Sequence, residues 1–313
     1  MRIKFSELYD ADLIVGTVYE GGSKGNISDD VISKLMKCEN SGGFRKVGKT
    51  NPIDLKYVIL FSTLQEEHWM DIIDEHKRIL IYHGDNRIPD NMYKKLNKLN
   101  INIIKTIKCS ETYDAISYHP DICVIKLNDN NILVAPNVYD YYNNCLKPLG
   151  FNIIKGNLPI DVKYPNNIQY NVAILGNKVI HNFKYTDKVL LDYIEKNKME
   201  KINVNQGYSK CSICIVDENS IITSDKGIYN EVIKHNIDCL LIENGHIDLF
   251  DLNHGFIGGC SGLISKNTLA FFGKIENHPN IKDIQMFLAK RNKKILSLSD
   301  DRLTDLGSLI PLI

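Results

Sequence analysis

Two polar side chains in the last third of the chain are candidates for chemistry. His246 and Asp248 belong to the stretch Gly245-His246-Ile247-Asp248, directly after the apolar run 240–242. Residues two apart in an extended segment share a face, so both side chains can point the same way. A histidine can move a proton near neutral pH, and a carboxylate can hold a planar cation through two hydrogen bonds. A lone histidine is more often a packed structural residue, so a functional role for His246 and Asp248 requires further site residues near them.

Two cysteines lie in surroundings that suit reaction. Cys260 is flanked by glycines in Gly258-Gly259-Cys260-Ser261-Gly262, which lets a substrate approach its backbone. Cys211 starts an expected hairpin strand after the polar loop 205–207. Tight packing of a small thiol is the alternative for each. Cys211 and Cys214 form a C-x-x-C, but no second pair at zinc spacing follows. Residues three apart on a strand face opposite sides, so we predict no metal site there.

Further polar residues recur at equivalent places along the chain. They either form turns and helix caps or line one shared channel. The set is Asp121, Asn137, Asn171, Asn205, Asp225 and Asp305. His119, which precedes Pro120, is expected to be a loop residue.

A repeat of hairpin, helix and strand positions these residues. Helices are predicted to begin near Pro89, Val138, Asp187, Gly227 and Asn280, each leading into an apolar run at 101–104, 151–154, 202–204, 239–242 and 295–298. Hairpins are predicted over 122–135, 171–180, 212–223 and 262–272, because Asn, Asp and Gly at their centres tolerate the positive φ of tight turns.

Four hairpins for five helix–strand units leave one hairpin missing. It can be assembled from a strand at 78–82 and the last residues, 306–313. If those segments pair, the ring closes and leaves neither edge exposed. The predicted fold class is therefore α/β, a pseudo-fivefold propeller of ββαβ units; an open sheet of similar units is the alternative.

Composition narrows the functional classes. The chain has 313 residues with 38 basic and 38 acidic side chains, so broad electrostatic capture of nucleic acid or of an anionic membrane is not expected. Neither a membrane span nor a signal peptide is evident, which predicts a cytoplasmic protein with thiols instead of disulfides. Phosphate-loop and dinucleotide motifs are lacking, so we predict no cofactor.

Residues 1–76 do not share the repeat and are predicted to form a small α+β segment, with a helix over 5–15 and a strand over 56–61. Short motifs in order resemble the N-terminal domain of AspBHI-type restriction endonucleases, which cut DNA near modified cytosine. They are Ala11–Val15, Tyr19–Gly22, Asp29-Asp30, Gly42–Arg45, Val58–Phe61 and Gly84–Pro89. The last motif overlaps the ring-closing strand, and we assign that strand to the ring.

Residues 77–313 resemble a bacterial family of uncharacterised proteins assigned to the pentein, or guanidino-group-modifying enzyme, fold. The resemblance rests on Tyr118–Asp121, Val134–Asn137, Tyr170–Ala173, Asn205–Ser212, Gly245–Asp248, Gly255–Gly259 and Leu303–Ser308. It implies five ββαβ units and a reaction in which a cysteine thiolate attacks a guanidino or amidino carbon, with a histidine as acid/base.

The resemblance implies roles for particular residues. His246 would be the acid/base, Cys260 or Cys211 the nucleophile, and Asp248 and Asp305 the substrate carboxylates, with Asn171, Asn205 and Asp225 at the same site. In the family the nucleophilic cysteine lies in the last unit, near the C-terminus; the corresponding stretch here, 305–311, has no cysteine, and Ser308 is a poor substitute without a base to activate it. A small-molecule C–N hydrolase or amidino-modifying enzyme is thus the first hypothesis. A non-catalytic interaction module and recognition of modified DNA through the N-terminal segment are the others.

Overall fold

The chain divides into two compact units, Met1–His76 and Lys77–Ile313. The structure is a computed structural model and describes residues 13–19, 55–62, 79–82, 90–99 and 101–312. In the first unit, β1 (Leu13–Tyr19) pairs antiparallel with β2 (Leu55–Ser62), so that Val15 lies opposite Leu60. The strand expected over 56–61 is confirmed. The helix expected over 5–15 is wrong for 13–15, and residues 5–12 lie outside the described part, as do the Gly-rich motifs at 21–26 and 42–45.

The described part of the second unit contains five three-stranded sheets with one shared topology. In each sheet the first two strands are antiparallel, and the third runs parallel to the second. Four sheets follow chain order. Their strands are β5 (Val124–Lys126), β6 (Asn131–Val134) and β7 (Asn152–Lys155); β8 (Ala173–Leu175), β9 (Lys178–His181) and β10 (Glu200–Asn203); β11 (Ile213–Asp217), β12 (Ser220–Thr223) and β13 (Asp238–Leu241); β14 (Ser261–Ser265), β15 (Thr268–Phe271) and β16 (Lys294–Ser297).

The fifth sheet joins the two ends of this unit. β17 (Ile310–Pro311) pairs antiparallel with β3 (Ile79–Tyr82), which runs parallel to β4 (Asn102–Lys105). The paired residues are Ile310 with Ile81 and Pro311 with Leu80. The predicted strand pairing between the two ends is therefore confirmed, and so are the four predicted hairpins.

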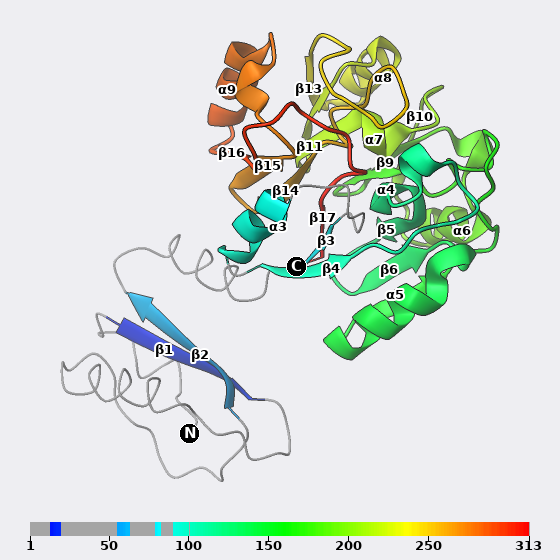
Figure 1. Cartoon of the computed structure of the whole chain (residues 1–313). Coiled ribbons are helices and arrows are strands. Elements are labelled where there is room, and N and C mark those ends of the chain that lie inside the picture. The colour runs from blue at the N-terminus through cyan, green and yellow to red at the C-terminus, as the bar shows by residue number, and fades with distance from the viewer. Residues whose placement is uncertain (1–12, 20–54, 63–78, 83–89, 100, 313) are drawn as a thin grey trace. The chain divides into compact units, whose positions relative to one another are not determined.

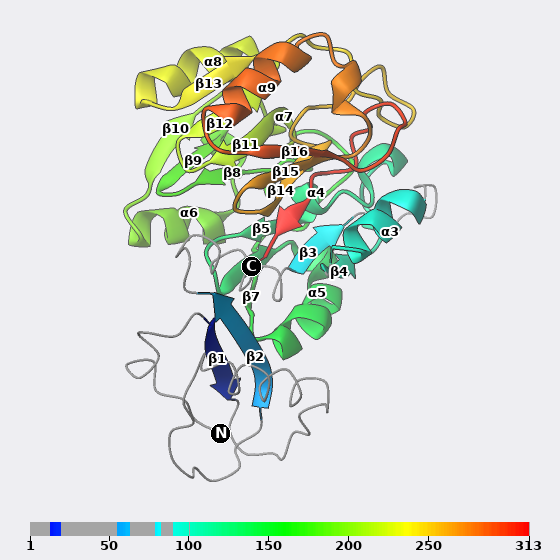
Figure 2. The same ribbon diagram turned by 90° about the vertical axis from the view of Figure 1, so that its left-hand side faces the viewer.

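One helix connects the second and third strands of every sheet, as the repeat predicted. These helices are α3 (Asp90–Asn97), α5 (Tyr139–Leu146), α6 (Lys188–Lys196), α8 (Lys226–Val232) and α9 (Ile281–Ala289). Each buries two side chains four residues apart, which lie on one helical face. The buried pairs are Met92 and Leu96, Tyr142 and Leu146, Leu190 and Ile194, Ile228 and Val232, and Ile284 and Leu288. Figures 1 and 2 show these helices on the outside of the unit and the sheets inside.

The first strands of the five sheets face a common interior. β8 contacts β11, β11 contacts β14, and β14 contacts β17. All five contribute to one pocket, which we call the strand pocket; it is lined among others by Val124, Ile174, Ile215, Leu263 and Ile310, one from each first strand. Residues that immediately precede these strands therefore meet near the same place. Two short helices lie there, α4 (Pro120–Cys123) and α7 (Ser209–Ser212).

The described residues contain neither a membrane-spanning helix nor a metal-binding cluster. None of the helices there has the length and apolar character needed to cross a bilayer. Within the same residues, no three His, Cys, Asp or Glu side chains are placed to hold a metal ion.

Candidate functional site

A buried polar cluster forms where the first strands begin. Cys211, on α7, donates its thiol to Asp121 Oδ2 at 3.2 Å. Asn171 Nδ2 donates to Cys211 Sγ at 3.0 Å and to the carbonyl of Asp121 at 3.0 Å. Asn171 Oδ1 accepts from the amides of Lys210 and Cys211, at 2.8 and 3.1 Å. The side chain of Asn171 therefore holds Cys211 both at its backbone amide and at its thiol.

Ser308 joins the same cluster from the chain's last segment. Its hydroxyl lies 2.6 Å from Asp121 Oδ2 and 2.9 Å from the carbonyl oxygen of Gly258, and it accepts from Lys210 Nζ at 2.9 Å. Asp121 and Ser308 are fully buried. The other carboxylate oxygen of Asp121, Oδ1, has no hydrogen-bond partner among the described residues. A buried carboxylate oxygen without a donor is costly to the folded state.

A second carboxylate, Asp305, lies beside the cluster. It accepts from the amide of Phe256 at 2.9 Å and from that of Gly307 at 3.0 Å. Its Oδ1 is 3.7 Å from Nδ1 of His119, and both side chains are buried. Burial, together with the nearby negative charge of Asp121, raises the pKa of Asp305 to about 7. The amides of Phe256 and Gly307 and the charge of Lys210 act in the opposite direction but do not cancel this rise. The carboxyl group therefore changes charge near neutral pH.

Two glycines make this approach possible. A Cβ on Gly259 would collide with the carboxylate of Asp305. Gly307 has φ +78°, a conformation that residues other than glycine rarely adopt, and a Cβ there would collide with His119. Neither position can take a side chain without displacing an acidic or imidazole group of the cluster.

Cys211, His119 and Asp305 line one pocket, which we call the thiol pocket, with a cavity of about 280 Å³. Its aromatic wall is built by Tyr113 and Tyr208, whose hydroxyls are 3.4 Å apart, and by Phe256, stacked on Tyr208 with ring centroids 6.4 Å apart. Aromatic faces attract cations. The wall and the carboxylate together make the pocket favourable for a positively charged ligand.

The thiol is not activated by its own surroundings. Burial raises the pKa of Cys211 well above its usual value, and the carboxylates of Asp121 and Asp305 add to the effect. Burial also raises the pKa of Tyr113. A cation placed next to Cys211 would oppose both carboxylates and lower the pKa of the thiol. A cation bound beside Cys211 would therefore favour its thiolate form.

The structure places the predicted acid/base and its neighbour elsewhere. His246 is 43% exposed, with its ring 3.6 Å from a Glu243 oxygen and edge-on to His278. Asp248 is half-exposed and pairs with Arg302 at 3.0 Å. Neither lines the thiol pocket. The Gly245–Asp248 segment does leave the sheet after β13, and the carbonyl of Asp248 accepts from the amide of Asp305 at 2.8 Å, but the side chains of His246 and Asp248 have other partners.

Three other predicted residues also lie outside the cluster. Cys260 is fully buried in an apolar cluster and donates its thiol to the carbonyl of Ile257 at 3.4 Å. Asp225 is the N-cap of α8, where it accepts from the amide of Ile228 at 2.9 Å. Asn205 and Asp225 line a separate polar pocket. The capping role is the alternative that turn and cap preferences offered for these side chains.

Of the predicted residues, Cys211, Asn171 and Asp305 are brought together. Cys211 belongs to a helical turn before β11, so its expected place at the start of a strand is corrected. The cluster also contains His119, which the sequence predicts as a loop residue, and Lys210, for which the sequence predicts no role. Asp121 is predicted only as one of the recurring polar residues. The available signal is the run His119-Pro120-Asp121, in which Asp121 lies three residues before the first strand β5.

Comparisons with known proteins identify relatives of both parts of the chain. A family of unknown function, DUF6873, has a model that matches residues 84–310. The N-terminal domain of the restriction endonuclease AspBHI matches residues 13–125, which confirms the resemblance expected there. No curated protein matches.

Among solved structures, the chain is similar to a serine mutant of DDAH from Pseudomonas aeruginosa complexed with citrulline, with 7% identity, 71% of this chain and 92% of that chain covered, and a TM-score of 0.49. It is also similar to an agmatine deiminase from C. jejuni (11% identity, 76% and 93% covered, TM-score 0.48). A third is an amidinotransferase from Microseira wollei (11%, 74% and 90%, TM-score 0.47).

Proposed function

We propose that this protein, which belongs to the DUF6873 family of unknown function, binds a small guanidine or amidine in the thiol pocket and acts on its C–N bond. The observation that carries the proposal is a buried thiol that donates to Asp121 and lines, with Asp305 and His119, one aromatic pocket. Small-molecule sites typically combine an apolar wall with a few convergent polar groups.

The fold supports this location. We propose that the five sheets form a pseudo-fivefold ring, because they share one strand order and their first strands line one pocket. In such a ring the residues just before the first strands converge on the axis. Asp121, Asn171, Cys211 and Ser308 lie two or three residues before the first strand of four of the five sheets.

The negative charges of Asp121 and Asp305 determine which class of ligand the thiol pocket favours. A guanidinium or amidinium is a planar cation with several donors, and a carboxylate accepts from it through two parallel hydrogen bonds. Asp305 offers such a carboxylate, since its pKa of about 7 falls when a cation binds beside it. Asp121 adds an oxygen without a donor next to the thiol. An anion would meet both carboxylates unfavourably, and a neutral ligand would leave them buried and uncompensated.

The reaction follows from these groups. Cys211 gives up its proton, which the bound cation favours, and His119 is the acid/base that carries it. Sγ bonds to the amidino carbon, and one C–N bond breaks as the departing nitrogen takes a proton and leaves as an amine. Water then adds to the same carbon, the C–S bond breaks, and the thiol recovers its proton. The products are an amine and a urea or amide, with no change of oxidation state.

A pair of probes tests the nucleophile. Chloroacetamidine is cationic and chloroacetamide is its neutral analogue; both alkylate thiols. With rates normalised to a free thiol, the amidine should label Cys211 at least about tenfold faster than the amide, because each 1.4 kcal/mol of charge stabilisation is worth tenfold. Peptide mapping by mass spectrometry locates the label. Cys211→Ala should abolish it, and Cys260→Ala should leave it unchanged.

Asp305→Asn separates charge from packing. This change should reduce the amidine's advantage over the amide, while the rate with the amide changes less. An amidine preference at the partly exposed Cys145 as large as that at Cys211, or equal rates for the two probes at Cys211, would remove the proposal. In that case the unit would be better regarded as a non-catalytic interaction module.

A second function is favoured by the first unit's match to the AspBHI N-terminal domain. We propose that this part of the chain recognises DNA that contains modified cytosine. The test is a gel-shift titration of the full chain with duplexes that differ only by cytosine methylation. Tighter binding of the methylated duplex is expected, and equal affinity for both duplexes would reject this function.

A further inference from the structure

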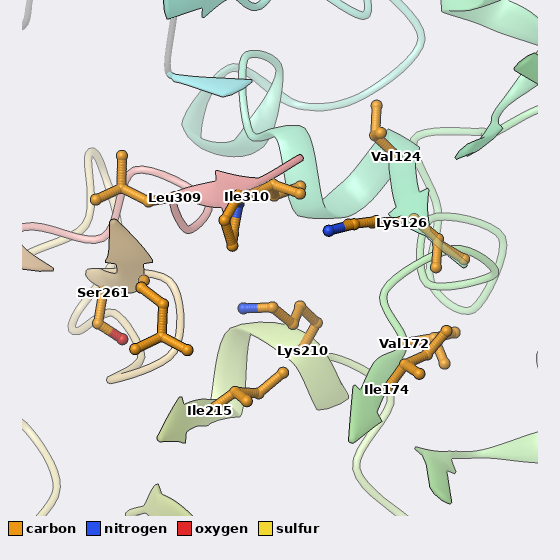
Figure 3. A pocket seen from close by; sticks show the side chains of 13 residues that line it. Val124, Lys126, Val172, Ile174, Lys210, Ile215, Ser261, Leu309 and Ile310 are labelled. Atoms are coloured by element: carbon orange, nitrogen blue, oxygen red, sulfur yellow. The ribbon is translucent and has the colours of Figure 1, made fainter. Parts of the chain in front are cut away.

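The strand pocket is a second cavity, separate from the thiol pocket in its lining residues. Its volume is about 200 Å³, smaller than the roughly 300–1,000 Å³ of sites for drug-sized ligands. Most of its wall is aliphatic, with Val172 and Ile174 from the β8 region, Ile215 from β11 and Leu309 and Ile310 at β17 (Figure 3). A pocket of this size and character suits a small molecule with an apolar body.

Two lysines interrupt the aliphatic wall. Figure 3 shows the side chains of Lys126, on β5, and Lys210, on α7, reaching into the space between the strands. Among the described residues that line the pocket, neither Asp nor Glu occurs. The strand pocket is therefore lined by two positive charges and by no acidic side chain; the nearest acids to Lys210, Asp121 and Asp305, lie behind Ser308 and outside the lining.

The existing partners of the two amines leave room for a ligand. Lys126 Nζ is 3.8 Å from a carboxylate oxygen of Asp129, whose side chain is fully exposed. Exposed pairs of this kind contribute little. Lys210 Nζ donates to the neutral hydroxyl of Ser308 and carries further hydrogens for other acceptors. Burial lowers the pKa of Lys126, so an anion beside it would be stabilising.

We propose that the strand pocket binds a small carboxylate with an apolar body, the carboxylate lying between Lys126 and Lys210 and the body against the aliphatic first strands. The two lysines are the reason for a negatively charged group, and the aliphatic wall is the reason for an apolar body. The site is distinct from the thiol pocket in ligand charge, since that pocket favours a cation. It does not depend on the function proposed for Cys211.

Calorimetric titration of the full chain with a matched series tests this proposal. Octanoate should bind more tightly than hexanoate, by roughly fourfold for each added methylene that the pocket buries. Acetate has the charge without the body, octanol the body without the charge, and octylamine the opposite charge. All three should bind at least about tenfold more weakly than octanoate.

Two variants and a control locate the ligand. Lys126→Met keeps the aliphatic stem and should weaken octanoate roughly 10- to 100-fold, the range for a hydrogen bond to a charged group. Ile174→Phe fills the pocket and should abolish binding. Lys196→Met, an exposed lysine on α6, should change nothing. Octanol or octylamine binding as tightly as octanoate, or an unchanged affinity in Lys126→Met, would overturn the proposal.

Discussion

The raised pKa of Asp305 predicts a specific loss of stability with rising pH. In the folded protein the pKa is about 7, against a usual value of 3.8. Between these values the folded state keeps the proton that the unfolded state has lost, so the free energy of unfolding falls as pH rises. The stabilisation is fully present below pH 4 and is lost by about pH 7. Each pKa unit is worth about 1.4 kcal/mol, which gives about 3 kcal/mol between pH 5 and pH 8.

The change Asp305→Asn removes this titration. The substitution itself lowers stability because a hydrogen-bond acceptor is lost: one of the two amides that donate to Asp305 would face an NH₂ group. That cost is independent of pH. Relative to wild type, the variant should therefore gain about 3 kcal/mol between pH 5 and pH 8, whatever its stability at either end.

The assay must report on the second unit, because the chain's one tryptophan, Trp69, belongs to the first. Urea titrations at each pH, read by hydrogen exchange of peptides from β11 and β12, meet this need. Asp248→Asn is the control, since Asp248 is half-exposed and pairs with Arg302; its pH dependence should match wild type. An Asp305→Asn variant with the wild-type pH dependence would refute the reasoning.

Further predictions concern stability, each measured by the same urea assay at fixed pH. Gly307→Ala should cost more than Gly150→Ala, because both have positive φ but only Gly307 would also collide with a neighbour, His119; about 1 kcal/mol is expected for Gly150 and at least 3 for Gly307. Asp187→Ala should cost about 3–5 kcal/mol and Asp225→Ala only about 1. Both cap helices, but Asp187 also accepts from the amides of Asn157 and Leu158. Equal costs within either pair would contradict the contacts described.

The architecture of the second unit could be predicted from sequence because its signals are local. Each helix is marked by apolar residues four apart, and each hairpin by an Asn, Asp or Gly turn. The error at Leu13–Val15 has a tertiary cause: these residues pair with Leu60–Ser62, a contact that a local pattern does not contain. Pairing between the ends was predictable because two unpaired strands remained when the hairpins had been assigned.

The site was harder to predict because its partners are distant in sequence. Ser308 bonds to Asp121 across 187 residues, and Cys211 to Asp121 across 90. Gly245–Asp248 attracted attention since its residues are adjacent, whereas His119 gains its neighbour Asp305 only through the fold. The common feature is positional: Asp121, Asn171, Cys211 and Ser308 each lie two or three residues before the start of a first strand.

The pairing of β17 with β3 is what assembles both ends of the cluster. Asp305 and Ser308 precede β17, while His119 and Asp121 come soon after β4, which completes the same sheet. The amide of Asp121 also donates to the carbonyl of Gly307 at 3.2 Å, so backbone and side chains both join these segments. A carboxylate whose pKa depends on this packing is therefore a reporter of the pairing between β17 and β3. Loss of the β17 pairing would return Asp305 to water, where burial no longer raises its pKa.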